Sequence, residues 1–475
     1  MTASETQRQS LLERALGVVT RVQPGEGVTA LLLTVDVFLL MTAYSAIKPV
    51  REGLILAMKS GAEYKSYMGA AIAVALLFAV PAYSRFADRL PRNRLIIGVT
   101  LFFAANLVAF WLASAVPSVR QHLGLVFYLW LGIFNMMVVA QFWAFANDLY
   151  REEQGKRLFP LLGVGQTVGA VAGSGLAALL LQVLGVFPML LASAALLTLT
   201  ALLTQIVHAR ESSSARREKP APPDAQESGS AQRETAPSDP REPGSSQGAA
   251  PKREGAFALV AGDPYLRYVA LFTVAFTFVN TNGEYMIGKL VTEAARGLVE
   301  RGELPAAEFE RWVSATYSRF YLYVNVATVA LQALVVSRLV RVGGMRVAFF
   351  VLPSIALLDA LGVSALPVLG VLFIGKVAEN ATDYSLNNTL RNMLWLPTTS
   401  EMKYKAKQAI DTFFVRMGDV SSALIVYVGA GILGHGVRTF ALVNLVLVLG
   451  WLAVARRIVK AYEALSARDP DASSS

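Results

Sequence analysis

The sequence predicts an all-α membrane protein with twelve transmembrane helices, arranged as two halves of six. Apolar residues make up 54% of the chain and the mean hydropathy is +0.47, whereas soluble proteins are usually about 45–50% apolar. Runs of about 20 residues with few charges recur, and each is long enough for a helix to cross about 30 Å of hydrocarbon. One long polar segment near the middle of the chain divides these runs six and six.

The expected helices follow one another with short connections on either side of that segment. By apolar character we place them at residues 27–47, 67–84, 95–116, 124–147, 159–184, 187–208, 257–288, 317–337, 347–364, 366–390, 410–434 and 438–456. The chain then divides into a cytoplasmic N-terminal segment (1–26), a first half (27–210), a linker (211–255), a second half (256–458) and a cytoplasmic tail (459–475).

The linker is rich in Ser, Pro, Ala, Arg and Glu and holds almost nothing apolar beyond alanine. Such a segment cannot bury enough apolar surface to offset the entropy of ordering. We therefore expect 211–255 to be a disordered cytoplasmic tether between the halves.

Basic residues indicate the orientation, because Lys and Arg in short loops concentrate on the cytoplasmic side of a membrane. Clusters of them follow the spans that end at 84, 147, 337, 390 and 456, whereas the loops after the spans ending at 184 and 364 contain neither residue. Both termini are therefore expected in the cytoplasm, and the chain in the inner membrane of a bacterium.

Two loops on the other side break this trend, at equivalent places in the two halves. The first span is followed by Lys48, Arg51, Lys59 and Lys65, and the seventh by Lys289, Arg296, Arg301 and Arg311. Either a functional demand for cations or an ordinary exposed loop would produce this pattern.

The chain contains no cysteine, which excludes disulfides and thiolate metal sites. Its three histidines, His122, His208 and His435, lie far apart near span ends. We expect no metal site, no cofactor and no nucleic-acid partner, and a monomer in the lipid bilayer.

Two basic turns at equivalent places suggest that one half is a duplicate of the other. Ser84-Arg85 opens the turn after the second span, and Ser337-Arg338 opens the turn after the eighth. In the first turn, Asp88, Arg89 and Arg92 follow a pattern that resembles the gate-latching loop of the major facilitator superfamily. The resemblance implies gating roles for these residues and for Arg338. A basic turn that merely fixes topology is the alternative.

Charged residues inside spans are costly unless they face a cavity or a partner. In the tenth span a polar stripe lies on one helical face and is expected to line water, although an internally neutralised pair of Lys376 with Glu379 or Asp383 would give the same pattern. The stripe consists of Lys376, Glu379, Asn380, Asp383 and Asn387.

The first helix of each half carries a similar polar set. The seventh span contains Asn280, Thr281, Asn282, Gly283 and Glu284 and then Lys289, and we expect a break in the helix there. The first span ends with Lys48, Arg51 and Glu52. Together these residues predict basic and acidic groups on opposite sides of one cavity.

Aromatic and amide groups at the end of the fourth span, Phe142, Trp143 and Asn147, could stack on a planar ligand. An aromatic belt at the membrane interface is the competing interpretation. In the fifth span, glycines four residues apart, at 165, 169 and 173, predict close helix packing rather than a phosphate loop, because no Gly-Lys-Ser/Thr follows.

Two segments resemble the ATP/ADP translocase family of bacteria and plastids. One is Phe142-Trp143-Ala144-Phe145-Ala146-Asn147 with the later Lys156-Arg157-Leu158-Phe159-Pro160, and the other is the stretch 384–411, which fits the family pattern without a gap. The resemblance implies a major-facilitator-like fold and substrate-binding roles for Lys48, Arg51, Glu52, Glu284, Lys405 and Lys407. Lys156 and Arg157 are assigned to gating.

An ATP carrier needs cations for the phosphates and aromatic or amide groups for the base. Lys48, Arg51, Lys289, Lys405 and Lys407 would supply the former, and Phe142, Trp143 and Asn147 the latter. Two departures from the family pattern concern charge, since Leu131 stands where the family has an acid and Asp383 where it has a lysine.

We therefore expect a secondary transporter, not an enzyme, whose substrate is an anionic small molecule with ATP and ADP as candidates. Two alternatives remain open. One is proton-coupled transport of another small molecule, with Glu284, Glu379 and Asp383 titrating. The other is a membrane sensor or scaffold that does not transport.

Overall fold

The computed structural model describes residues 10–17, 20–87, 92–218 and 255–467. All regular structure in these ranges is helical. The first part contains α1 (Leu11–Leu16), α2 (Gly27–Leu56), α3 (Gly61–Ala87), α4 (Arg92–Ala113), α5 (Pro117–Arg120), α6 (Leu123–Leu149), α7 (Glu152–Leu184) and α8 (Pro188–Glu218).

The second part contains several helices in which a π-helical stretch continues an α-helix. Its elements are α9 (Ala256–Gly262), α10 (Pro264–Glu300), η1 (Ala306–Glu308), α11 (Phe309–Leu331), η2 (Gln332–Val336), α12 (Ser337–Ala365), α13 (Leu369–Thr382), η3 (Asp383–Asn387), α14 (Asn388–Met393), η4 (Met402–Ala406), α15 (Lys407–Ala409), η5 (Ile410–Phe414), α16 (Val415–Val426), η6 (Tyr427–Ile432) and α17 (Val437–Ser466).

The described helices make a multi-pass membrane protein. Nine of them are long and apolar enough to cross a membrane, and the bent pair α9–α10 brings the number to ten. The sequence predicts twelve spans, and two places account for the difference. Residues 306–365 form one continuous stretch and count as a single span, although Gly344 interrupts the helix with φ 60° and ψ −172°. The α13–α14 stretch carries four charged residues, at 376, 379, 383 and 391, which make it less apolar.

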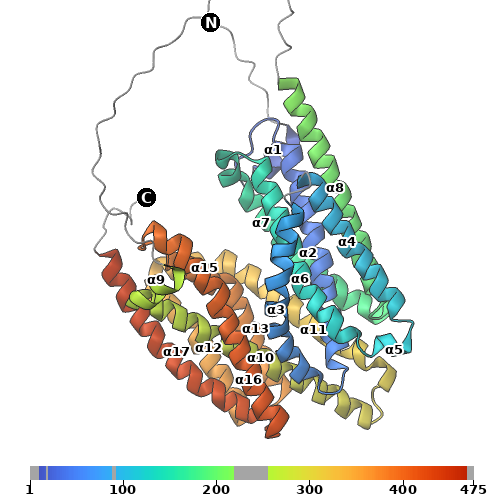
Figure 1. Ribbon diagram of the computed structural model, residues 1–475, viewed down its shortest axis with the longest axis vertical. Helices are drawn as coiled ribbons and strands as arrows, with labels where there is room; N and C mark the ends of the chain where they lie inside the picture. The colour runs from blue at the N-terminus through green and yellow to red at the C-terminus, as the bar shows by residue number, and fades with distance from the viewer. Residues whose placement is uncertain (1–9, 18–19, 88–91, 219–254, 468–475) are drawn as a thin grey trace, which may run out of the picture.

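The helices form two groups (Figure 1). One apolar core joins residues of α2, α4, α6, α7 and α8, and a second joins α9, α10, α12 and α17 with the 386–410 region. A third core contains residues of both groups, around Ile55, Leu56, Tyr285 and Tyr317. The end of the molecule that contains this third core is called the closed end.

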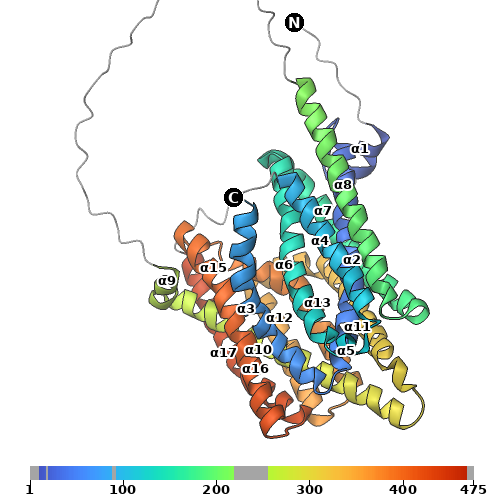
Figure 2. The same cartoon turned by 45° about the vertical axis from the view of Figure 1, so that its right-hand side comes forward.

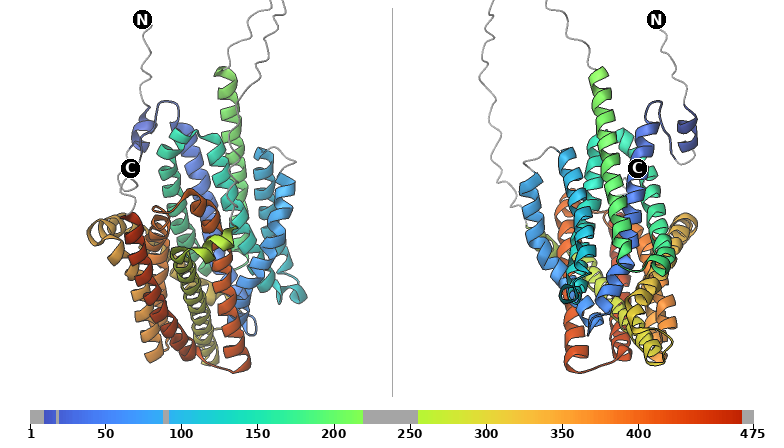
Figure 3. Two further views of the ribbon diagram at one scale, coloured as in Figure 1. Left: turned by 60° about the vertical axis from the view of Figure 1, so that its left-hand side comes forward. Right: turned by 90° about the vertical axis from the view of Figure 1, so that its right-hand side faces the viewer.

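The opposite end, where residues 218 and 255 lie, is called the linker end. The two groups separate toward it, and α1 and the end of α17 lie on that side (Figures 1 and 2). There α8 extends beyond the other helices of its group (Figure 3). It runs to Glu218 and thus enters the stretch 211–255 that composition alone assigns to the linker.

Glycines let α2 and α7 pack backbone against backbone, as their spacing predicts. A Cβ at Gly165 would lie 2.6 Å from the Thr34 carbonyl oxygen, and one at Gly169 or Gly173 would collide with the next carbonyls along α2. Further along, Asp36 of α2 is 2% exposed and accepts a hydrogen bond of 2.9 Å from the Thr204 hydroxyl of α8. Contacts on both sides therefore fix the position of α2.

The expected seventh span, 257–288, is two helices that meet at 105°. Asp263 ends α9 and caps α10, because its side chain accepts hydrogen bonds from the backbone N–H groups of Tyr265 and Leu266, and Pro264 fits the first helical turn.

The predicted break at 280–284 is wrong, because α10 is helical throughout 264–300. Several of its polar side chains form hydrogen bonds with groups of other helices, without an opened backbone. Asn282, for example, donates to the carbonyl of Phe440 and to Oδ1 of Asn444. Gly283 gives room to Lys376, whose Nζ lies 3.0 Å from the position a Cβ would take.

Several basic residues expected in loops lie inside helices, among them two lysines with acidic partners. Lys65 is in the second turn of α3, which begins at Gly61, and Lys289 is in the middle of α10. Both form ion pairs with acids of other helices. Hydropathy along the chain cannot detect such partners, and it therefore ends a span at the first lysine.

Candidate functional site

A cavity of about 280 Å³ lies on the boundary between the two groups, on the linker-end side of the shared core. Helices α2, α3 and α6 form one wall, and α10, α11, α13, η3 and α16 form the other. It is lined by Tyr44, Lys48, Arg51, Lys65, Ser66, Gly69, Tyr128, Asn280, Thr281, Glu284, Tyr285, Tyr321, Asn380, Tyr384, Arg416 and Asp419.

Two cations of α2 enter this cavity between aromatic rings. Nζ of Lys48 lies 4.2 Å from the ring centroid of Tyr321 and 5.7 Å from that of Tyr44. The Arg51 guanidinium lies 4.2 Å from the Tyr128 ring and forms an ion pair with Glu52. Among the described residues, Lys48 is the cation of the cavity wall for which no ion pair with an acid is found.

Lys65 joins the two groups beside the Arg51–Glu52 ion pair. Its ammonium lies 2.9 Å from Glu52 of α2 and 3.1 Å from Glu284 of α10. Lys65 and Glu52 are 5% and 0% exposed. Tyr317 and Tyr321 of α11 complete the network, since Lys65 donates to the first and the second donates to Glu52.

The polar stripe of α13 reaches the same cavity through α10. Asn380 donates to Glu284, and Lys376, which is fully buried, donates to Asn280 at 2.9 Å and pairs with Glu379 at 2.9 Å. Asp383 and Glu379 do not line the central cavity. They line a cavity of about 10 Å³ deeper in the second group, against Trp451 of α17.

Several lining residues were missed by the sequence analysis. Five tyrosines line the cavity, and one of them, Tyr44, belongs to the end of the first span, four residues before Lys48. Arg416 and Asp419 pair at 2.8 Å inside the expected eleventh span, where the cost of intramembrane charge should have identified them. Lys65 is marked in the sequence only as one of the basic residues after the first span, because its acidic partners are distant in sequence.

The residues proposed to stack on a base lie elsewhere. Phe142 is in the core of the first group, Trp143 packs edge-on against Phe159, and Asn147 is exposed toward the linker end. Asn282 is buried beside α17. Lys289 pairs with Glu63 of α3 at 2.8 Å at the closed end. In this conformation none of these described side chains lines the cavity, and their roles remain predictions.

Lys405 and Lys407 lie at the linker end, outside the cavity. Lys405 pairs with Glu401 at 2.6 Å, and Lys407 donates to Asn392. The gating candidates lie at this end as well. Lys156 is exposed, and Arg338 donates to the Leu334 carbonyl. Asp88, Arg89 and the side chain of Arg92 lie outside the described residues.

Arg157 ties the start of α7 to the start of α2. Its guanidinium lies 2.9 Å from Glu26, and Gln154 also donates to Glu26. Burial opposes ionisation of Glu26, but the hydrogen bonds from Arg157, the Gln23 backbone and Gln154 outweigh it and lower the pKa of this carboxyl.

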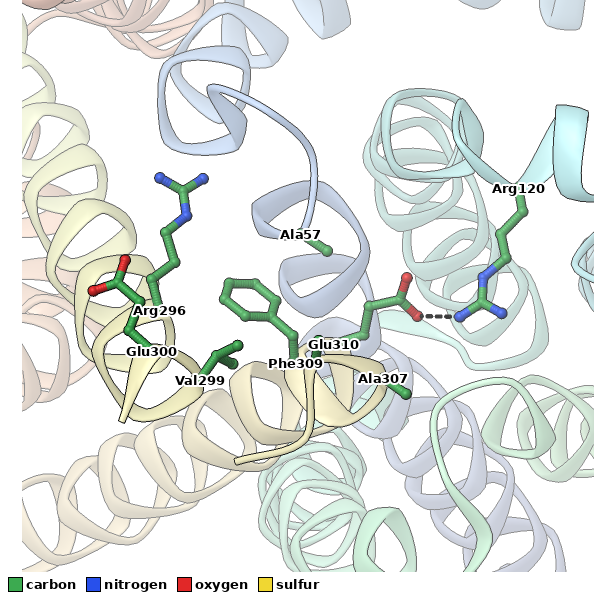
Figure 4. A pocket seen from close by; sticks show the side chains of 9 residues that line it. Ala57, Arg120, Arg296, Val299, Glu300, Ala307, Phe309 and Glu310 are labelled. Atoms are coloured by element: carbon green, nitrogen blue, oxygen red, sulfur yellow. Dashed lines mark hydrogen bonds and ion pairs between the residues drawn. The ribbon is translucent and has the colours of Figure 1, made fainter. Parts of the chain in front are cut away.

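A second pocket, of about 390 Å³, opens at the closed end between residues of both groups. Figure 4 shows Ala57 of the first group and Ala307 and Phe309 of the second around it, with Arg120 paired to Glu310 at 3.0 Å. Within the described ranges no group of three or more His, Asp or Glu side chains is arranged to hold a metal ion.

Comparisons with known proteins agree on the class of fold. The sequence model of the Major Facilitator Superfamily matches residues 28–392. The chain is 22% identical to ADP,ATP carrier protein 1 of Chlamydia pneumoniae over 368 residues, which cover 70% of this chain and 66% of that protein, just under two thirds of its length.

Solved structures with the same fold are transporters. The nucleoside transporter NupG matches with a TM-score of 0.59 and 11% identity, covering 90% of this chain and 98% of that one. A bacterial homologue of the human lysosomal transporter Spinster, inward-facing and unoccupied, matches with a TM-score of 0.54 and 14% identity, covering 92% and 98%. Identities this low show a common fold alone.

Proposed function

The chain belongs to the Major Facilitator Superfamily and is a membrane transporter of that type, and we propose that it carries an anionic, phosphorylated small molecule through the central cavity by alternating access. The nucleotides ATP and ADP are the first candidates. The observation that carries the proposal is Lys48, a half-buried cation between two tyrosine rings for which no ion pair with an acid is found among the described residues.

The charge of the cavity favours an anion. Four cations line it, Lys48, Arg51, Lys65 and Arg416, against two acids, Glu284 and Asp419, and Glu52 lies just behind the wall. The wall therefore carries a surplus of positive charge in surroundings of low dielectric, where an unpaired ion gains most from a counter-ion. Tyrosine rings on both sides suit a flat organic group.

The relative from Chlamydia pneumoniae supports nucleotides as the first candidates. The two departures from the translocase pattern do not change the cavity wall. Leu131 is fully buried in the core of the first group, and Asp383 faces the small cavity in the second. At about 280 Å³ the central cavity is at the small end of ligand sites, which usually measure about 300–1,000 Å³. Binding of a nucleotide therefore requires the linker end to widen or rearrange.

For the topology, we propose twelve spans in two six-helix halves with both termini in the cytoplasm. Gly344 separates the eighth span from the ninth, and the charged α13–α14 stretch is the tenth. The Lys and Arg clusters at the linker end support a cytoplasmic placement. The structure would then be inward-facing, because both groups meet at the opposite, closed end.

Reconstituted protein in liposomes tests this proposal. We expect uptake of labelled ADP that rises when the liposomes contain ATP, and a loss of at least about tenfold in Lys48→Ala, equivalent to about 1.4 kcal/mol. Lys48→Arg should retain part of the uptake. Lys59→Ala removes an exposed lysine outside the cavity and serves as the control. Absence of nucleotide uptake by the wild type, with or without internal nucleotide, would refute the nucleotide assignment.

Proton-coupled transport of another small molecule is the second candidate. The observation that favours it is the number of acids in and beside the cavity, Glu284 and Asp419 on its wall and Glu379 and Asp383 behind α10. Uptake of the transported compound would then require an inward proton gradient and would persist in the absence of internal nucleotide.

A further inference from the structure

A buried carboxyl group that none of the sequence motifs includes lies beside the polar stripe of α13. Asp359, in α12, is 8% exposed. Its side chain lies directly against α13 at Gly375, where a Cβ would collide with the carboxyl group. Oδ1 of Asp359 has no hydrogen-bond partner among the described residues. A buried polar atom without a partner is rare, because it costs the free energy of desolvation.

Asp359 shares its surroundings with a second acid and a single cation. The carboxyl groups of Asp359 and Glu379 interact directly, and Lys376 acts on both. The Lys376 ammonium lies 2.9 Å from Glu379. Asp383, one turn further along, faces the same cavity of about 10 Å³ as Glu379, which has room for about one water molecule.

This arrangement favours a shared proton. Two carboxylates that occupy one site cannot both ionise without a large cost, and one lysine cannot neutralise two buried acids together with the half-buried Asp383 beside them.

The charged groups that act on the site come from every side of it. Lys376 and Glu379 belong to α13, Asp383 to η3 and Glu284 to α10, and Arg391 of α14 acts on Asp383. The rest of the small cavity is apolar or amide and consists of Phe276, Val279 and Asn280 of α10, Leu352 and Ala356 of α12, and Trp451 of α17.

Lys376 connects this site to the bridge between the groups. Its ammonium lies over Gly283 of α10 and donates to Asn280, one turn earlier. Glu284 is the next residue after Gly283, and it holds Lys65 of the first group at 3.1 Å. Lys376 thus lies between two acids, Glu379, with which it pairs, and Glu284, with which it interacts through space.

We propose that Asp359 and Glu379 form a proton-binding site whose protonation weakens the Lys65–Glu284 bridge at the closed end. With one proton on the pair, the Glu379 carboxylate holds Lys376. A second proton, taken from water, forms an O–H bond on Glu379 and removes its charge. Lys376 then turns to Glu284 and competes with Lys65 for it. The inference rests on the proposed transport function, because it makes the proton the coupled ion.

The absence of cysteine from the chain makes the proposal testable in the full-length protein. Ala57 and Ala307 are exposed, uncharged and on the wall of the same pocket at the closed end, one in each group (Figure 4). The double variant Ala57→Cys, Ala307→Cys would carry two spin labels, and pulsed electron paramagnetic resonance would measure the separation between the two groups.

We expect the ratio of long to short label separations to rise at least about threefold on going from about pH 8 to about pH 5.5. Asp359→Asn imitates the pair with its first proton in place, so it should keep the short separation at about pH 8 and the rise at about pH 5.5, because Glu379 can still take up the second proton. Glu379→Gln imitates the protonated acid and should give the long separation at both. These opposite outcomes keep the test decisive if one variant fails to fold.

Asp36→Asn is the matched control, since it removes another buried carboxyl group that lies in the first group. It should keep the pH response. A wild type without a pH response, a response that survives in Glu379→Gln, or one that is lost in Asp36→Asn would overturn the proposal. No substrate is added, so failure of nucleotide transport would leave this result untouched, and a negative result here would leave the nucleotide assignment standing.

Discussion

Lys65 of α3 and Glu284 of α10 form an ion pair of 3.1 Å that joins the two helix groups between the central cavity and the closed end. The same ammonium also lies 2.9 Å from Glu52, so that one lysine partly neutralises two acids, the buried Glu52 and the half-buried Glu284. A carrier of this fold must break such contacts to open at the closed end. The bridge therefore combines a structural role with a conformational one, and its removal should affect both.

We predict a large loss of stability for Lys65→Met. Removing one partner of a buried pair leaves an uncompensated charge and costs about 3–5 kcal/mol. Lys289→Met is the control, because Lys289 forms a partly exposed pair with Glu63 at the same end, and such pairs contribute about 0–1 kcal/mol. Thermal unfolding in detergent measures both. Equal losses in the two variants would show that Lys65 is not the critical contact.

Gly169→Ala should destabilise the first group. A Cβ at this position collides with the Phe38 carbonyl of α2, and such overpacking costs about 1–3 kcal/mol. Gly163→Ala lies on the same helix with nothing within 4 Å of the added atom, and it should be neutral or slightly stabilising, since alanine favours helix over glycine. The unfolding temperature of each variant tests this prediction. A Gly169→Ala variant that unfolds at the wild-type temperature would argue against the packing of α2 on α7.

The ring of Tyr321 should matter more than its hydroxyl group. Tyr321→Leu removes the face over which Lys48 lies at 4.2 Å, and a cation–π contact is worth about 0.5–2 kcal/mol. We expect ADP binding to weaken about 2- to 30-fold in that variant. Tyr321→Phe, which loses only the hydrogen bond to Glu52, should bind ADP within about threefold of the wild type.

The control for this prediction is Tyr323→Leu, on the same helix but exposed on its outer face. It should leave ADP binding unchanged. If all three variants bind equally well, the tyrosine wall does not position Lys48 for the substrate.

The Glu26–Arg157 contact should make stability depend on pH at the linker end. The pKa of Glu26 lies below its ordinary value of 4.5. Its stabilising contribution is therefore present above that value and is lost as the pH falls through the lower, folded-state pKa. Unfolding temperatures measured from neutral to acidic pH should fall less steeply in Glu26→Gln than in the wild type. Glu153→Gln, an exposed acid in the first turn of α7, should keep the wild-type slope.

The all-helical membrane fold could be predicted because long apolar runs and their glycine spacing are local properties. The structure also brings together Lys48, Arg51, Glu284 and Asn380 at one cavity, and charge inside a span identified them without any knowledge of their partners. Their part in binding remains a prediction.

Long-range pairing explains what the sequence could not show. From the sequence alone, Lys65 is expected in a loop. In the structure it lies in a helix and pairs with Glu284 of the other group. Asp359 lies in an apolar helix, and its possible role follows only from its contacts with Gly375 and Glu379 on the next helix, which the sequence does not show. The expected break in α10 failed for the same reason, since side chains of α13 and α17 satisfy the polar groups that would otherwise suggest an opened backbone.

The contact between Asp36 and Thr204 also bears on how the protein is made. Asp36 lies in α2, and its partner lies 168 residues later in α8. During synthesis the first helix must therefore enter the bilayer before its hydroxyl partner has left the ribosome. An acid at the centre of a helix costs about 2.5–3.5 kcal/mol of insertion free energy. Until α8 arrives, α2 depends on the insertion machinery or on its other neighbours to stay in place, so folding of the first group is completed only by its last helix.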